Sequence, residues 1–279
     1  MEILQQITKS VFEGYVPSAK MPERNDSVYD SLQQQFAAVY AHLIDQVVGE
    51  GNETAFDSNE LLKNEVVRFV CLQAFANTIR SLDLVLTATG FGIVSTGSMT
   101  PASKNRVDAL KEECRLHAIE CLHRIIQHMI LVEGWGSTYQ ARQTLQCLFW
   151  RIDFLRADTT LEYTADNWQL ARGRALIADA FLRKVISTEY MDELLDKLRN
   201  HSLDDADNII VNKCIQLMGT FISDYDTCKS PDQKQLDAIM QHMETYTSNY
   251  PTYEQSETYK ARHAERYQNR KEDSTFFFM

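Results

Sequence analysis

The chain has 279 residues, of which 44% are hydrophobic and 10% aromatic, and both values are typical of a folded globular protein. Its 28 basic and 39 acidic side chains leave a formal net charge of -11, which disfavours general binding to nucleic acid or to an anionic membrane surface. Six cysteines occur without a C-x-x-C pair or a preceding secretory segment, and no apolar run reaches the roughly 20 residues of a membrane span, so we expect reduced thiols and no membrane association.

The spacing of the apolar residues predicts an all-α fold. Apolar positions recur at intervals of three and four, which places them on one face of a helix, and only 10 glycines and 5 prolines interrupt the chain. We expect a peripheral N-terminal helix over residues 1–14, a peripheral loop over 15–25 and then a first long helix that ends at Gly49 and Gly51. The apolar stripe of this long helix consists of Val28, Leu32, Phe36, Val39, Leu43 and Val47.

Capping patterns predict where the later helices begin. Thr100 followed by Pro101 predicts the start of a helix over residues 101–133, because proline at the first helical position loses no hydrogen bond. At about 1.5 Å per residue this helix would be roughly 50 Å long, which predicts an elongated bundle with long central helices. Reciprocal capping pairs mark four other starts, at Asp57 with Glu60, Ser137 with Gln140, Asp166 with Gln169, and Ser230–Pro231 with Gln233.

The last thirty residues differ from the rest of the chain. They are highly charged, yet they contain several tyrosines and end in Phe-Phe-Phe-Met, and such an apolar end requires a surface to cover it. We therefore predict one helical bundle over residues 1–249 and an extended C-terminal interaction arm over residues 250–279. The expected partner-binding residues of the arm are Tyr253, Tyr259, Tyr267, Phe276, Phe277 and Phe278.

A glycine-rich stretch, "GFGIVSTGSMTPASKNRV", separates two of the predicted long helices. It does not match a dinucleotide fingerprint, because Ser95 occupies a required glycine position, and it lacks the G-K-[ST] ending of a P-loop. We interpret it as a connector whose short apolar segment docks on a partner through Phe91, Ile93 and Val94.

The segment "EECRLHAIECLH" is the richest metal-like pattern in the chain. Cys114, His117 and Cys121 share a helix face, and Glu120 with His123 has the Glu-x-x-His spacing of di-iron bundles. A di-iron bundle needs a second such helix and two further glutamates, and the two cysteines also fall on an apolar stripe. We therefore assign no metal, cofactor or catalytic residue, and keep a metal-binding helical enzyme that uses Glu120 and His123 as an alternative.

The stretches "GFGIVS" and "PASKNRVDAL" resemble a family of virion proteins of phages and prophages from Bacteroides-type bacteria, which we identify with head-to-tail connectors, or portal adaptors. The resemblance covers about residues 25 to 200. The residues that carry it are Phe91, Gly92, Val94, Pro101, Ala102, Ser103, Lys104, Arg106 and Val107.

This resemblance implies a non-enzymatic structural protein of the virion neck, assembled in the bacterial cytoplasm. It implies a homo-oligomeric ring, twelvefold in such connectors, that binds the portal and adjoining neck or tail proteins and continues the DNA channel without reading DNA sequence. An acidic channel lining is consistent with this, because it neutralises few phosphates and lets DNA slide. A second alternative is a helical protein-interaction module outside the virion.

Overall fold

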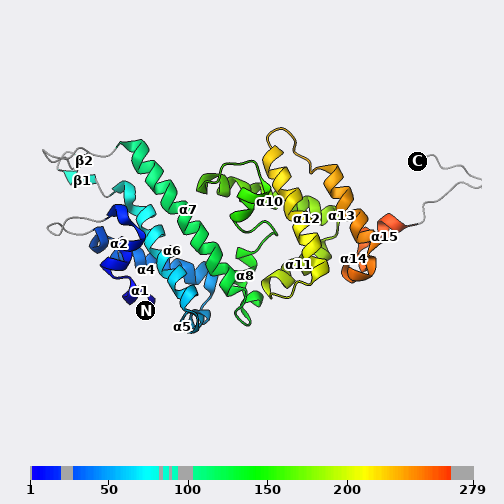
Figure 1. Cartoon of the computed structure of the whole chain (residues 1–279), viewed down its shortest axis with the longest axis horizontal. Helices are drawn as coiled ribbons and strands as arrows, with labels where there is room; N and C mark the ends of the chain where they lie inside the picture. The colour runs from blue at the N-terminus through cyan, green and yellow to red at the C-terminus, as the bar shows by residue number, and fades with distance from the viewer. Residues whose placement is uncertain (1, 20–27, 82–83, 88–89, 94–102, 265–279) are drawn as a thin grey trace, which may run out of the picture.

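A computed structural model of the chain shows an elongated, predominantly α-helical molecule made of two lobes that follow each other along its long axis (Figure 1). The structure describes residues 2–19, 28–81, 84–87, 90–93 and 103–264. Within these residues a two-stranded hairpin accompanies the helices. No helix of this part of the chain combines the length and the apolar character that crossing a membrane requires.

The N-terminal lobe is built around α6 and α7, which pack against each other along most of their length. Its helices are α1 (Glu2–Gln6), α2 (Lys9–Tyr15), α3 (Val28–Ser31), α4 (Gln33–Leu43), α5 (Ala55–Ser58), α6 (Glu60–Thr78), α7 (Lys104–Met129) and α8 (Tyr139–Thr144). Shorter helical turns are η1 (Pro17–Ala19), η2 (Ile44–Val48), η3 (Asn52–Thr54), η4 (Ile79–Ser81) and η5 (Trp135–Ser137).

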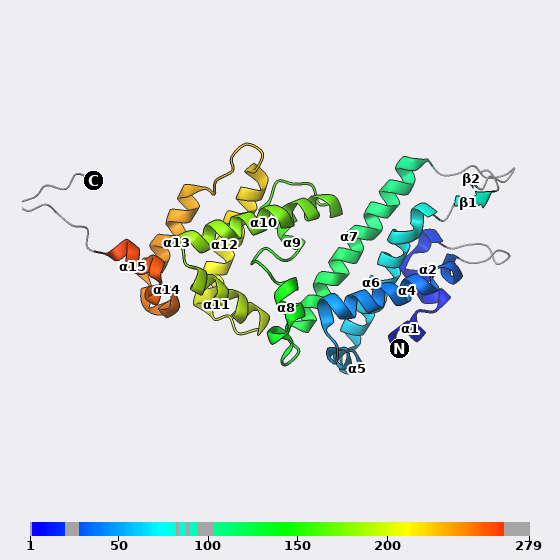
Figure 2. The same cartoon turned by 180° about the vertical axis from the view of Figure 1, so that it is seen from behind.

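The C-terminal lobe is built around α10 and α12 (Figure 2). Its helices are α9 (Asp153–Asp158), α10 (Ala165–Val185), α11 (Thr188–Arg199), α12 (Asp205–Asp224), α13 (Gln233–Thr245), η6 (Thr247–Asn249), α14 (Pro251–Gln255) and α15 (Glu257–His263). The small side chains of α10, among them Ala171, Ala175 and Ala178, are fully buried, so the neighbouring helices approach it closely.

Each lobe has its own hydrophobic core, whereas the sequence predicted one bundle over residues 1–249. The N-terminal core holds an aromatic cluster in which Phe12 contacts both Phe36 and Phe75. The C-terminal core holds Tyr190 and Tyr250, whose rings meet edge to face. Helical periodicity shows which face of a helix is buried but not which helix covers it, so no boundary between the two cores can be predicted from it.

The lobes are joined through α7 and through the irregular segment 145–152. The carboxylate of Glu112, on α7, accepts hydrogen bonds from the backbone N–H groups of Ala165 and Asp166 at 2.6 and 3.2 Å, and so caps the start of α10 from the other lobe. The guanidinium of Arg199 donates to the carbonyl oxygen of Leu145 at 2.8 Å. These hydrogen bonds, of which that of Arg199 is buried and that of Ala165 is partly buried, join the two lobes.

The predicted helices are present, but their starts are shifted. The structure starts α6 at Glu60 with Asn59 as its cap instead of Asp57, and α7 at Lys104 after Ser103, while Thr100 and Pro101 lie outside the described residues. The other three starts are shifted by one or two residues. They are capped by Thr138, Thr164 and Asp232, whose side chains accept from the N–H groups of Ala141, Asn167 and Gln235.

The start of the glycine-rich stretch forms the second strand of a short antiparallel hairpin, which the sequence did not predict. Strand β1 (Leu84–Thr87) pairs with β2 (Gly90–Ile93), and Leu86 lies opposite Phe91. Gly90 and Gly92 are therefore strand residues and not part of a phosphate-binding turn at the start of a helix.

The first part of the predicted C-terminal arm belongs to the C-terminal lobe. Tyr250, the N-cap of α14, and Tyr253, within α14, are fully buried in its core, and α15 follows along the chain. Tyr259 is half-buried and meets the ring of Tyr253 edge to face. The expected boundary at residue 250 thus moves to the end of α15, and residues 265–279 lie outside the described residues.

Candidate functional site

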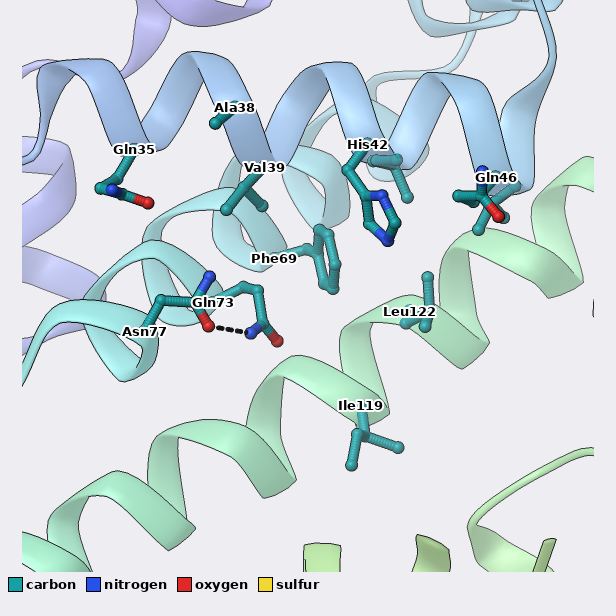
Figure 3. A pocket seen from close by; sticks show the side chains of 12 residues that line it. Gln35, Ala38, Val39, His42, Gln46, Phe69, Gln73, Asn77, Ile119 and Leu122 are labelled. Atoms are coloured by element: carbon teal, nitrogen blue, oxygen red, sulfur yellow. Dashed lines mark hydrogen bonds between the residues drawn. The ribbon is translucent and has the colours of Figure 1, made fainter. Parts of the chain in front are cut away.

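A groove crosses the N-terminal lobe, with α4 and its continuation η2 on one side, α7 on the other and α6 at the bottom (Figure 3). Its volume is about 440 Å³. The apolar side chains that line it are Ala38, Val39, Leu43, Val47, Phe69, Ile119 and Leu122, and the polar ones are Gln35, His42, Gln46, Gln73 and Asn77.

The lining of the groove contains no aspartate, glutamate, lysine or arginine, although 24% of the chain is charged. Its polar groups are four carboxamides and one imidazole, and the amide of Gln73 donates to the side-chain oxygen of Asn77 at 2.7 Å (Figure 3). A carboxamide carries both a donor and an acceptor, as a peptide group does. The arrangement can hold apolar side chains on its floor and pair with a peptide backbone at its rim.

A π-helical turn shapes one end of the groove. The backbone N–H of Gly49 donates to the carbonyl oxygen of Ile44 at 2.7 Å, five residues earlier, which closes a wider turn than an α-helix has. Gly49 has a φ of 84°, a conformation that favours glycine. Such turns leave nearby carbonyl groups without helical partners and are frequent at functional sites.

Three side chains satisfy the carbonyl oxygens of this turn. The indole N–H of Trp135, the largest fully buried side chain of the structure, donates to Val47 at 2.9 Å. Gln140 donates to Asp45 at 3.1 Å, and Asn52 donates to Val48 at 2.9 Å. Because these donors come from outside α4, the end of the groove has a fixed shape in which buried polar groups are paired.

The sequence carries one signal for this groove that none of its motifs shows. From Ser31 to Ile44 the chain carries no charged residue, although α4 exposes one face to solvent. The exposed positions Gln35, Ala38, His42 and Gln46 recur at helical spacing along that face. An exposed helix face without charge is unusual for a monomer surface and indicates a surface that something covers.

The metal-like segment serves packing in this structure. His123 is buried between Trp150 and Trp168, with ring centroids 6.2 and 5.0 Å away, and its Nδ1 accepts a hydrogen bond from the backbone N–H of Ile152 at 3.0 Å. Glu120 accepts a hydrogen bond from the hydroxyl of Tyr163 at 3.1 Å. No group of three or more possible metal ligands occurs among the residues that the structure describes.

Burial also explains the two cysteines of that segment. Cys114 and Cys121 are buried on α7, and burial raises the pKa of their thiols to about 11 and about 12. A thiol held in its protonated form is a poor nucleophile and a poor metal ligand. His117, between them in sequence, is half-buried.

His123 should make the protein sensitive to acid. Burial lowers the pKa of its imidazole from 6.5 to about 3, so between these pH values the unfolded chain binds a proton that the folded chain does not. This contribution to stability is present above pH 6.5 and is lost as the pH falls toward 3, at up to about 1.4 kcal/mol per pH unit. Urea unfolding of the wild type and of His123→Asn between pH 7 and pH 4.5 measures it.

Asparagine places an oxygen near the position of Nδ1 and cannot be protonated there, so His123→Asn should be less stable at pH 7 but less pH-dependent. The control is His201→Asn, at an exposed residue with a φ of 51° that asparagine tolerates, and it should keep the wild-type slope. Equal slopes for the wild type and His123→Asn would contradict the assignment.

The predicted partner-binding residues are not brought together in the described part of the chain. The backbone of Phe91 and Ile93 lies in β2, at the tip of the N-terminal lobe (Figure 1). Tyr253 is in the core of its own lobe, and Tyr259 is half-buried beside it. The other predicted residues, Val94, Tyr267, Phe276, Phe277 and Phe278, lie outside the described residues.

Large apolar side chains are exposed in two further places. Leu61 and Leu131 are 69% and 60% exposed, and they line the same surface depression beside His128. On α10, Leu170, Leu176 and Ile177 are each exposed by 40% or more. The described chain thus leaves several apolar surfaces uncovered.

Comparison with known sequences gives one partial match. Residues 21–143 are similar to a family of unknown function (DUF6712), and all the residues that line the groove fall within this segment. A search of curated proteins and a search of solved structures found no match.

Proposed function

We propose that the protein is a structural subunit whose activity is self-association and attachment to neighbouring proteins of an assembly. The observation that carries the proposal is the uncharged groove across the N-terminal lobe, with its apolar floor and carboxamide rim. The exposed leucines of α6, α10 and the turn after α7 support it, because large apolar surfaces on a soluble chain mark sites of association.

We infer further that the assembly is the neck of a tailed phage, with this chain as a head-to-tail connector subunit that forms a ring below the portal. The support is the resemblance of residues 90–107 to virion proteins, together with an elongated helical body. The formal charge of -11 is compatible with a ring through which DNA passes without sticking. Sequence-specific contact with DNA forms no part of this proposal.

Removal of residues 272–279 should abolish the assembly while leaving the fold intact. The deletion takes away Phe276, Phe277, Phe278 and Met279, and every residue of the described hydrophobic core stays in the chain. We expect the truncated chain to keep its helical circular dichroism and to run as a monomer in light scattering, whereas the full chain forms an oligomer alone or on its portal.

A full-size oligomer or unchanged incorporation into particles after this deletion would remove the C-terminal residues from the proposal. Loss of helix content would show instead that these residues stabilise the lobe itself.

A further inference from the structure

We propose that the C-terminal residues Phe276–Met279 of one copy occupy the groove between α4, α6 and α7 of a second copy. The proposal rests on the function proposed above and adds to it the surface that receives the tail. The groove is lined by apolar side chains and neutral carboxamides, and residues 276–279 of the same chain are Phe-Phe-Phe-Met.

The chemistry of the two parts is complementary. Phe69 and Leu122 form part of the apolar floor, where phenylalanine and methionine side chains would leave water. Gln35 on α4, Gln46 on η2 and Asn77 on α6 offer donors and acceptors to the backbone of an extended peptide. A cavity of about 440 Å³ is in the range of sites that hold a few apolar side chains.

A polar, charged segment separates the last described residue from the apolar residues 276–279 in the sequence. Ten residues separate Ala264, the last described residue, from Thr275, and six of them are charged, with three positive and three negative side chains. The segment therefore has no net charge that would oppose docking on a neutral groove. Fully extended, residues 265–279 span at most about 50 Å.

The positions of the two parts favour contact between copies. Helix α15, which leads into the tail, lies at one end of the long axis, whereas α4 and α6 lie in the lobe at the other end (Figures 1 and 2). A contact that joins one end of a molecule to the opposite part of the next is heterologous, and repeated contacts of this kind build rings or filaments. A ring subunit needs a contact of this type.

A peptide titration tests the contact itself. The labelled peptide of residues 265–279 should bind saturably to the chain that lacks these residues, and a peptide with alanine at 276–278 should not.

Two adjacent exposed alanines of α4 provide matched variants, because Ala38 lines the groove and Ala37 does not. Ala38→Glu places a charge in the groove and should weaken binding by about tenfold or more, whereas Ala37→Glu should leave the affinity unchanged. Absence of saturable binding, or equal affinities for the two variants, would overturn the proposal.

A mixing experiment tests whether the contact joins two copies. Full-length Ala38→Glu has a tail but a blocked groove, and the chain that lacks residues 265–279 has a groove but no tail. Each should be monomeric alone, and the mixture should give a one-to-one dimer in light scattering above the dissociation constant of the peptide. Mixing two chains that both lack residues 265–279 should give no dimer.

The outcomes separate this inference from the proposed function. If Ala38→Glu and the chain that lacks residues 265–279 both still form the oligomer of the wild type, other surfaces join the copies. This result would overturn the inference and leave the proposed function standing. Peptide binding without a mixed dimer would place the tail in the groove of its own molecule and would also overturn the inference. A wild type that is monomeric alone and on its portal would overturn the proposed function.

Discussion

Replacement of Gly219 by alanine should lower the free energy of unfolding by roughly 3 kcal/mol. Gly219 lies in α12, where the helix meets the end of α9, and a Cβ atom there would overlap the backbone carbonyl of Asp158. Nearby, the hydroxyl of Ser223 accepts a hydrogen bond from the N–H of Thr160 at 3.0 Å, so the two elements cannot separate without loss of that bond. The close approach is between two backbones, which leaves no flexible side chain to yield.

Gly173→Ala is the matched control for this prediction. Gly173 lies in the interior of α10, and a Cβ atom there meets nothing within 4 Å. Alanine should therefore stabilise the protein by roughly 0.5–1 kcal/mol, because it reduces the conformational freedom of the unfolded chain. Urea unfolding followed by circular dichroism measures both changes, and a destabilisation of similar size in the two variants would contradict the packing of α12 on α9.

Replacement of Trp135 by phenylalanine should cost about 3 kcal/mol, because it combines two losses. The indole is completely buried in the N-terminal core, and its N–H is the hydrogen-bond donor to the carbonyl oxygen of Val47. Phenylalanine leaves a small cavity and a buried carbonyl group without its partner. The amides of the π-helical turn, Ile44–Val48, should then exchange hydrogen faster than in the wild type.

Trp150→Phe separates the two losses. Trp150 is also buried, and no hydrogen bond joins its indole N–H to the described residues; its replacement weakens packing and the ring contacts with His123 and Arg151. We expect Trp135→Phe to be the more destabilising by about 1–3 kcal/mol, the cost of an unpaired buried polar group. Equal costs, with unchanged exchange in the π-helical turn, would show that the hydrogen bond does not hold this end of the groove.

The helical fold could be predicted from the sequence because helix faces are local features. The stripe of Leu32, Phe36, Val39 and Leu43 is buried as its spacing indicated. Helix starts are harder to predict, since several residues near each start can cap it. Asp57 and Asn59 both have side chains suited to the role, and only the tertiary packing of α6 decides that Asn59 takes it.

Long-range arrangements could not be predicted in the same way. The cap that Glu112 supplies to α10 joins residues more than fifty positions apart, and no local pattern marks it. The same holds for Trp135 and Val47, which shape the groove. Tyr253 lies among polar and charged residues, which led to the prediction of an exposed arm, yet the fold buries it. The charged neighbours in sequence can point to solvent while the ring of Tyr253 faces the core.

The groove could be predicted only in part from the sequence. Its residues come from three helices whose packing the sequence did not reveal, but the absence of charge on the exposed face of α4 could have been read directly. The metal-like segment shows the opposite situation, since His123 and Cys121 form a plausible pattern in sequence and are packed and hydrogen-bonded as core residues in the fold.

Native mass spectrometry of the purified chain, alone and with the portal protein of the proposed assembly, tests the central claim most directly. If copies of the chain cover the apolar surfaces that one copy leaves open, the spectrum should contain one closed oligomer with a single stoichiometry. A chain that stays monomeric at every concentration and in the presence of the portal would contradict the account.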